Sequence, residues 1–154
     1  ALTLRGGRVI ARPYLPGLPL APATLEGAPG DEAGARVLEL AGSRSWRLAF
    51  DASYEGPLSV RIGEESGLSV TLEESRLTVD LTDTRYPHGG RRVVTLDAGE
   101  ASRVEILHDR SITEIYLGDG SRVFTTRSFL NGDGSGVSLT GAASVTNVSA
   151  ARAD

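Results

Sequence analysis

The stretch GLSVTLEESRLTVDLT (residues 67–82) decides the fold, because its apolar residues recur at every second position. Successive side chains of a β-strand point to opposite faces, so this period of two predicts two strands that each bury one face. The polar residues between them would face solvent. The apolar positions are Leu68, Val70, Leu72, Leu77, Val79 and Leu81.

The same alternation recurs on both sides of this stretch, in SWRLAF (residues 45–50) and LSVRI (residues 58–62). Turn residues fall between the apolar runs at short intervals. They occur at Gly6-Gly7, Glu55-Gly56-Pro57, residues 64–67, residues 97–99, Asp119-Gly120 and residues 131–136. About a dozen short strands with this spacing predict an all-β fold, a two-sheet antiparallel β-sandwich of the jelly-roll or lectin-like kind.

Little or no helix is expected. The best helical candidate is residues 28–35, and Gly30 and Gly34 argue against it. A proline-rich segment, residues 13–30, holds five of the seven prolines and favours extended backbone outside the sheets. It is interpreted as a covering loop, with an arm that docks on another domain as the alternative.

Length and composition limit the classes of function that the chain can have. The 154 residues predict one domain, and a net charge of −4 with 16 scattered arginines and no lysine argues against nucleic-acid binding. No cysteine is present, which excludes disulfides and thiolate chemistry. No apolar run is long enough for a membrane span, and the first residues lack a signal pattern. A cytoplasmic location is therefore favoured, and secretion stays open if the true N-terminus is missing.

One segment could carry acid–base chemistry: HDRSITEIYLGDGSRVFTTRSF (residues 108–129), with Asp109 and Glu114 ahead of a turn. Glycoside hydrolysis needs two carboxylates about 5 to 9 Å apart across a cleft. Nothing nearby suggests a pocket or an orienting partner, so both acids are interpreted as hairpin residues. Asp119-Gly120 predicts a two-residue type I′ turn, with Glu114 and Tyr116 on one face of the strand before it.

A second segment, TDTRYPHGGRR (residues 82–92), concentrates positive charge around aromatic residues. Arg85, Tyr86, His88 and Arg91 could clamp a sugar or an anionic sugar phosphate, and the alternative is a solvated loop. No metal or cofactor is predicted. The two histidines, His88 among them, lack zinc-ligand spacing. NGDGSG (residues 131–136) lacks the glutamate that a calcium loop needs at its twelfth position.

The residues of the 108–129 segment resemble the signature hairpin of the C-terminal β-sandwich of glycoside hydrolase family 32, the β-fructosidases. LTLRGGRVIARP (residues 2–13) resembles the segment by which that family enters its sandwich. SRLTVDLT (residues 75–82) resembles a strand that usually ends in Asp-Arg, with Leu81 in place of the arginine. The matching signature residues are Asp109, Arg110, Ser111, Glu114, Ile115, Tyr116, Asp119, Gly120, Val123, Phe124, Thr125, Arg127 and Phe129.

The resemblance implies that catalysis belongs to an upstream five-bladed β-propeller with Asn-Asp-Pro, Arg-Asp-Pro and Glu-Cys motifs, none of which occurs here. It implies a non-catalytic C-terminal module, covering residues 1–154, of an enzyme that cleaves sucrose, sucrose 6-phosphate or fructans. The expected partner is the propeller of the same polypeptide, which the module would stabilise, with a homodimer as a further possibility.

Two alternatives remain open. A carbohydrate-binding module for fructan would expose aromatic side chains, with Trp46, Tyr54, Tyr86 and Tyr116 as candidates, although the alternation of Trp46 with Leu48 indicates a core position. A small free-standing glycosidase would use the two acids of the signature hairpin.

Overall fold

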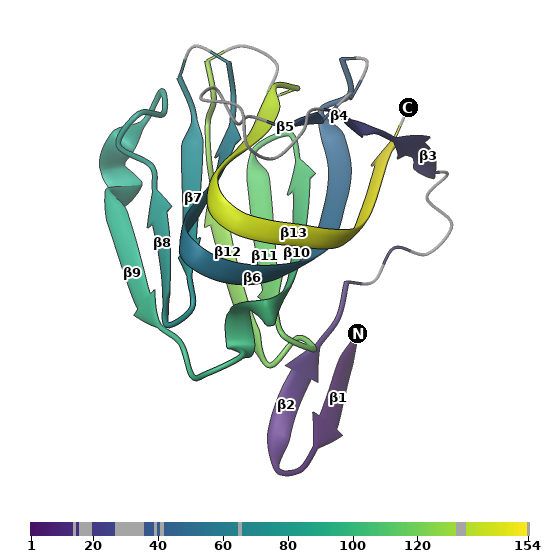
Figure 1. Ribbon diagram of the computed structural model, residues 1–154. Helices are drawn as coiled ribbons and strands as arrows, with labels where there is room; N and C mark the ends of the chain where they lie inside the picture. Colours follow the sequence, from purple (N-terminus) through teal and green to yellow (C-terminus); the bar gives the residue numbers. More distant parts are fainter. Residues whose placement is uncertain are drawn as a thin grey trace.

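The computed structural model describes residues 1–13, 15, 20–26, 36–38, 40, 42–64, 66–131 and 135–153. These residues form an antiparallel all-β structure with two short 3₁₀ turns, η1 (Pro87–Gly89) and η2 (Glu100–Ser102), and no α-helix (Figure 1). The strands are β1 (Leu2–Arg5), β2 (Arg8–Ala11), β3 (Leu20–Ala23), β4 (Leu25–Glu26), β5 (Arg36–Leu38), β6 (Ser45–Ile62), β7 (Leu68–Glu73), β8 (Arg76–Asp80), β9 (Arg91–Thr95), β10 (Arg103–Asp109), β11 (Ile112–Leu117), β12 (Arg122–Arg127) and β13 (Val137–Ala153). The predicted all-β sandwich is confirmed. The helical candidate, residues 28–35, lies outside the described residues.

Two long strands, β6 and β13, belong to both layers of the sandwich and curve from one to the other (Figure 1). The first half of β6 pairs with β10, which continues into β11 and β12. Its second half pairs with β7, which continues into β8 and β9. β13 runs antiparallel to β6 along most of its length and also pairs with β3 and β5. The two layers are therefore joined by continuous backbone.

The predicted turn at Glu55-Gly56-Pro57 is wrong, because these residues lie inside β6 where the strand bends. Leu58 pairs with Gly141, and Tyr54 pairs with Ala143, so three residues of β6 face one residue of β13. Such a bulge interrupts the ladder and bends the strand. Pro57 has no amide hydrogen to donate, and at this interruption none is required.

The prediction of non-sheet backbone for the proline-rich segment is also partly wrong. Its described part includes β3, which contains Pro22 and pairs only with β13, and β4, which pairs with β5. Proline is tolerated in an edge strand, because one side of that strand has no partner to receive a donor. Residues 14, 16–19 and 27–30 of this segment lie outside the described residues.

The apolar faces that the alternation predicted meet between the layers and are buried. Leu68, Val70 and Leu72 of β7 are fully buried, as are the alternate residues Val60 and Ile62 of β6. The core position of Trp46 is confirmed, since its side chain is buried with those of Leu48 and Phe50. Among the described residues, no helix has the length and apolar character to cross a membrane.

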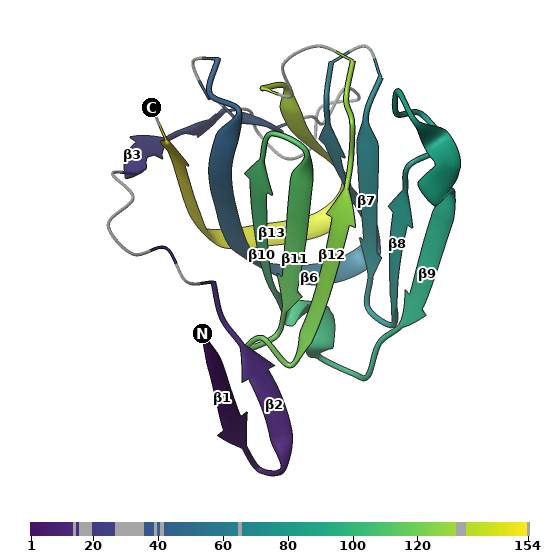
Figure 2. The ribbon, with the colours of Figure 1, turned by 180° about the vertical axis from the view of Figure 1, so that it is seen from behind.

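The β1–β2 hairpin projects from one end of the sandwich and forms a separate two-stranded sheet (Figure 2). Ile10 of β2 is buried, and the amide of Ala11 donates to the carbonyl oxygen of Gly120 at 2.9 Å. A Cβ at Gly120 would lie 2.0 Å from the carbonyl oxygen of Ala11, so the close contact between hairpin and sandwich requires glycine there.

Candidate functional site

A pocket of about 710 Å³ lies where the projecting hairpin meets the outer face of β10 and β11. We call it the hairpin cleft. Arg103 and Glu105 reach it from β10, Arg47 from β6 and Tyr116 from β11. The hairpin side contributes residues 11–13 and Leu15, and the β11–β12 connection contributes residues 118–120.

Ion pairs and hydrogen bonds satisfy most of the charge in the hairpin cleft. Arg47 Nε donates to Glu105 Oε1 at 2.5 Å, and Arg103 Nη1 donates to Asp51 Oδ1 at 2.9 Å. Hydrogen bonds from Asn147 and Arg103 lower the pKa of Asp51. Solvent screens such half-exposed pairs, so they fix side-chain positions more than they stabilise the fold. The result is a polar wall of matched charges.

Tyr116 connects the hairpin cleft to the signature hairpin. Its hydroxyl donates to Glu114 Oε2 at 3.0 Å. Burial and then the hydrogen bond to Glu114 raise the pKa of Tyr116 to about 12, so its hydroxyl stays protonated at neutral pH. As predicted, Glu114 and Tyr116 share the outer face of β11, and Ile115 and Leu117 are buried on the inner face.

The other signature residues also make contacts within the fold. Asp109 accepts a hydrogen bond from the Ser45 hydroxyl at 2.6 Å. The Ser111 carbonyl accepts the amide of Ser128 at 2.8 Å. Asp119 lies 3.6 Å from Arg5. Phe124 packs against the core, and the Arg127 guanidinium lies 5.4 Å from the centroid of the Phe129 ring.

The turn chemistry of the signature hairpin differs from the prediction. Asp119-Gly120 is not a two-residue type I′ turn, because Leu117 pairs with Arg122 and four residues connect β11 to β12. Two glycines, Gly118 and Gly120, take positive φ there, and Asp119 does not. The two-residue connection is instead between β10 and β11, at Arg110 and Ser111, with Arg110 at φ 56°.

Asp109 and Glu114 lie on the outer face of adjacent strands, where Asp109 pairs with Ile112 and Glu114 with Leu107. Each carboxylate is held by a different hydroxyl, and neither lines the hairpin cleft. Within the described residues, no group of three His, Asp or Glu side chains could hold a metal ion.

The arginines of the positively charged loop, residues 82–92, make two different kinds of contact. Arg91 forms two hydrogen bonds to Asp80 Oδ2, at 2.8 and 2.9 Å. Hydrogen bonds from Thr82 and then from Arg91 lower the pKa of Asp80 to about 2. Arg85 instead lies over the ring of Tyr86, 5.6 Å from its centroid. His88 is exposed in η1.

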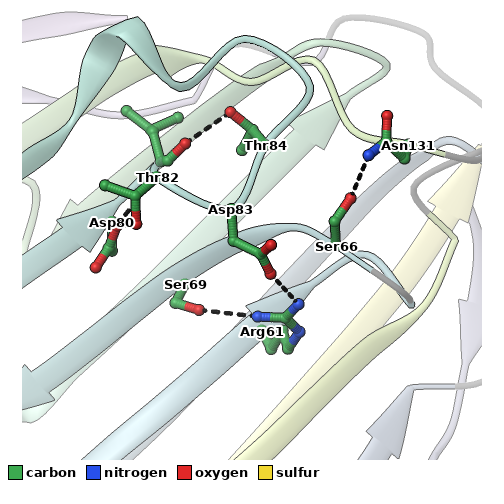
Figure 3. Close-up of polar contacts among 9 residues, drawn as sticks. Arg61, Ser66, Ser69, Asp80, Thr82, Asp83, Thr84 and Asn131 are labelled. Carbon is green, nitrogen blue, oxygen red and sulfur yellow. Dashed lines mark hydrogen bonds and ion pairs between the residues drawn. The ribbon is translucent and has the colours of Figure 1, made fainter.

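Figure 3 shows how the start of this loop is fixed to the layer beneath it. Asp83 faces Arg61 of β6 and accepts from its Nη2 at 2.6 Å, and the hydroxyl of Thr84 donates to the Leu81 carbonyl at 2.7 Å. Beside it, Asn131 Nδ2 donates to Ser66 Oγ at 2.7 Å. In this loop, Arg91 is thus paired with Asp80, whereas Arg85 and Tyr86 form a separate, exposed pair.

No local motif marks Arg47, Arg103 and Glu105 of the hairpin cleft. They occupy polar positions of alternating strands, which is the pattern of any solvent-facing side. Only the pairing of β10 with β6 places Glu105 beside Arg47, and local sequence carries no signal for that pairing.

Comparison with known proteins agrees with this architecture. Residues 26–153 match the family model of the glycosyl hydrolases family 32 C terminal domain. The chain belongs to this family. A search of curated proteins finds no match.

Solved structures with similar folds include enzymes of glycoside hydrolase family 32. A β-fructofuranosidase from Bombyx mori is 18% identical with a TM-score of 0.68, and a family 32 enzyme from Bifidobacterium adolescentis is 17% identical with a TM-score of 0.72. The sucrose-6-phosphate hydrolase of Lactobacillus gasseri is 14% identical with a TM-score of 0.75. Each match covers 99% of this chain but only 31%, 24% and 32% of the respective relative. The chain is thus similar to about a third or less of each of these enzymes.

Proposed function

We propose that this chain is the non-catalytic C-terminal module of a β-fructosidase, and that it packs on and stabilises a preceding β-propeller domain of the same polypeptide. The observation that carries the proposal is the apolar outer face of the β1–β2 hairpin. Leu2, Leu4 and Val9 are 77%, 74% and 59% exposed.

These side chains form one continuous surface. Leu4 pairs with Val9 and Leu2 with Ala11, and directly paired residues of an antiparallel ladder share a face. The opposite face carries Ile10, which is buried. Apolar residues on the face that points away from the core are expected where another domain covers them.

The comparisons support the choice of occupant. The family model begins at residue 26, whereas the solved enzymes match 99% of the chain and extend well beyond it. The hairpin therefore lies outside the matched family domain, and the proposed occupant is the propeller. The hairpin cleft beside it, with its paired charges, would form the polar rim of an interface of about 600 to 1,500 Å².

The docking surface can be tested in the complete polypeptide encoded by the gene. Leu4→Asp is expected to lower its free energy of unfolding by about 1.5 kcal/mol, because burying a leucine side chain contributes that much or more. In the 154-residue chain alone the same change is expected to have almost no effect, since Leu4 is exposed there. Thermal or urea unfolding of both proteins measures the difference.

Thr3→Asp is the matched control, because it adds the same charge to the same strand on the opposite face. Equal losses of unfolding free energy for the two variants in the complete polypeptide would contradict docking through the Leu4 face.

Sedimentation of the 154-residue chain tests the further proposal that the module forms a homodimer.

The non-catalytic role has a direct test. The purified chain incubated with sucrose, inulin and levan is expected to release no fructose, and any release that Glu114→Gln abolishes would establish the free-standing glycosidase instead.

The binding-module alternative needs exposed aromatic rings. Trp46 is buried, the Tyr54 hydroxyl donates to the Ala101 carbonyl at 2.8 Å, and Tyr116 is engaged by Glu114, which leaves Tyr86 as the exposed candidate among the four. Calorimetry with inulin and levan fragments would show heat only if this alternative holds.

A further inference from the structure

A second pocket, of about 320 Å³, is lined in part by Arg110 and Ser111 of the β10–β11 turn. This turn lies at the end of the sandwich opposite the β1–β2 hairpin (Figure 1). Three backbone hydrogen bonds tie the walls of the pocket together. The amide of Arg110 donates to the Arg44 carbonyl at 2.9 Å, that of Arg85 to the Phe129 carbonyl at 2.8 Å, and that of Ser128 to the Ser111 carbonyl at 2.8 Å. The loops that form the pocket are therefore held in fixed positions. We call it the arginine pocket.

The lining of the arginine pocket is positively charged and contains no carboxylate. Its side chains include those of Arg44, Arg85 and Arg110. Within the described part of the chain, none of these three guanidinium groups forms an ion pair. Asp109, the nearest acid in sequence, accepts from Ser45 and does not line the pocket.

Seven other arginines of the described residues have a carboxylate within ion-pair distance, whereas the three arginines here share one pocket without one. The seven are Arg5, Arg47, Arg61, Arg76, Arg91, Arg103 and Arg122. Three unpaired guanidinium groups around one concave surface create a local positive potential that an anion of two charges would relieve. Guanidinium groups also match the geometry of phosphate oxygens.

The remaining wall is aromatic. Tyr86 and Phe129 pack edge to face with ring centroids 5.3 Å apart, and they are 50% and 39% exposed. Exposed aromatic rings beside a charged group suit a ligand that has both a polar head and a ring. The pocket volume is at the lower end of the range of about 300 to 1,000 Å³ that small-molecule sites occupy.

We propose that the arginine pocket binds a phosphate monoester that carries a sugar or similar ring, with the phosphoryl group held by Arg44, Arg85 and Arg110. The ring packs against Tyr86 and Phe129. This site retains two residues of the predicted sugar clamp, Arg85 and Tyr86. It does not include Arg91, which is held by Asp80. The proposal is independent of the docking function, because the hairpin lies at the other end of the sandwich.

The binding test is an NMR titration of the ¹⁵N-labelled 154-residue chain with glucose 6-phosphate, glucose and inorganic phosphate. Glucose 6-phosphate is expected to shift the amides around Arg85, Arg110 and Phe129 saturably below about 10 mM. Inorganic phosphate should bind more weakly to the same residues, and glucose should shift none of them. Absence of saturable shifts, or shifts spread over the whole surface, would overturn the proposal.

Substitutions identify the groups that bind. Arg85→Gln and Arg44→Gln are each expected to raise the Kd for glucose 6-phosphate about tenfold, because each removes charged hydrogen-bond donors. Phe129→Ala should raise the Kd for glucose 6-phosphate but leave the Kd for inorganic phosphate unchanged. Arg76→Gln is the control, since Arg76 is exposed on β8 and pairs with Glu73.

The control separates a site from general attraction between charges. Arg76→Gln makes the same change in net charge and should alter Kd by less than about twofold at 0.1 M salt, where charges more than about 10 Å apart are screened. An equal loss in Arg76→Gln would show that phosphate binds by overall charge and would reject the pocket. Dispersed amide spectra confirm folding of each variant, and the two arginine variants provide independent measurements.

Discussion

Gly141→Ala is expected to lower the free energy of unfolding by about 3 kcal/mol, the largest single effect that we predict. Gly141 has φ 130°, a conformation that residues with a side chain rarely adopt. A Cβ at this position would also lie 2.1 Å from the carbonyl oxygen of Pro57. Backbone strain and a clash with backbone therefore act together, and neither partner can move without disturbing the bend of β6 and β13.

Gly99→Ala is the matched control. Gly99 has φ 78°, but no atom lies within 4 Å of the position its Cβ would take. Gly99→Ala should therefore lower the free energy of unfolding only by the cost of placing alanine at positive φ, about 1 kcal/mol. Urea unfolding of the two variants and the unchanged chain gives both values. A loss in Gly141→Ala no greater than in Gly99→Ala would show that the bend relaxes and that the contact with Pro57 is not required.

The bend at Gly141 also shows where sequence reasoning succeeds and fails for this fold. Strict alternation, as in β7 and β8, predicted both the strands and their buried faces, because a half-buried strand is defined by a period of two. Gly56 and Pro57 are typical of turns, and they are equally typical of bulges. The choice depends on Gly141 of a distant strand, which local sequence does not reveal.

The candidate sites depend on distant contacts in the same way. The exposed pair of Arg85 and Tyr86 could be selected from composition, since charge and aromatic residues are concentrated there. Arg44 and Arg110, which complete the arginine pocket, lie in other loops that carry no local motif for binding. They become neighbours because β6 pairs with β10, so that the ends of these strands meet.

His108 gives the second prediction, because it is a buried titratable side chain inside the sandwich. Its ring stacks on Trp46 with centroids 5.3 Å apart, and its Nδ1 lies 2.9 Å from Thr113 Oγ1. Thr113 in turn lies 3.3 Å from Ser128 Oγ. Burial lowers the pKa of His108 to about 4, an effect that nearby Asp109 only partly opposes. The neutral imidazole is therefore the form that the fold stabilises.

The free energy of unfolding is expected to fall by about 2 kcal/mol between pH 7.5 and pH 5. In the unfolded chain a histidine takes up its proton near pH 6.5, whereas folded His108 stays neutral until about pH 4. The unfolded state thus binds more protons in this range, and stability present above pH 6.5 is lost as the pH falls toward 4. Urea unfolding at a series of pH values measures the slope.

His108→Gln should remove this slope, because an amide does not titrate and can still accept from Thr113. Its stability at pH 7.5 need not match that of the unchanged chain, since the readout is the difference between two pH values. The paired carboxylates act at lower pH: the pKa of Asp80 is about 2, and those of Asp51 and Glu100 are also lowered. Their contribution is lost mainly below pH 4.5. A slope between pH 7.5 and pH 5 that persists in His108→Gln would therefore place the proton uptake on another group and contradict a neutral, buried His108.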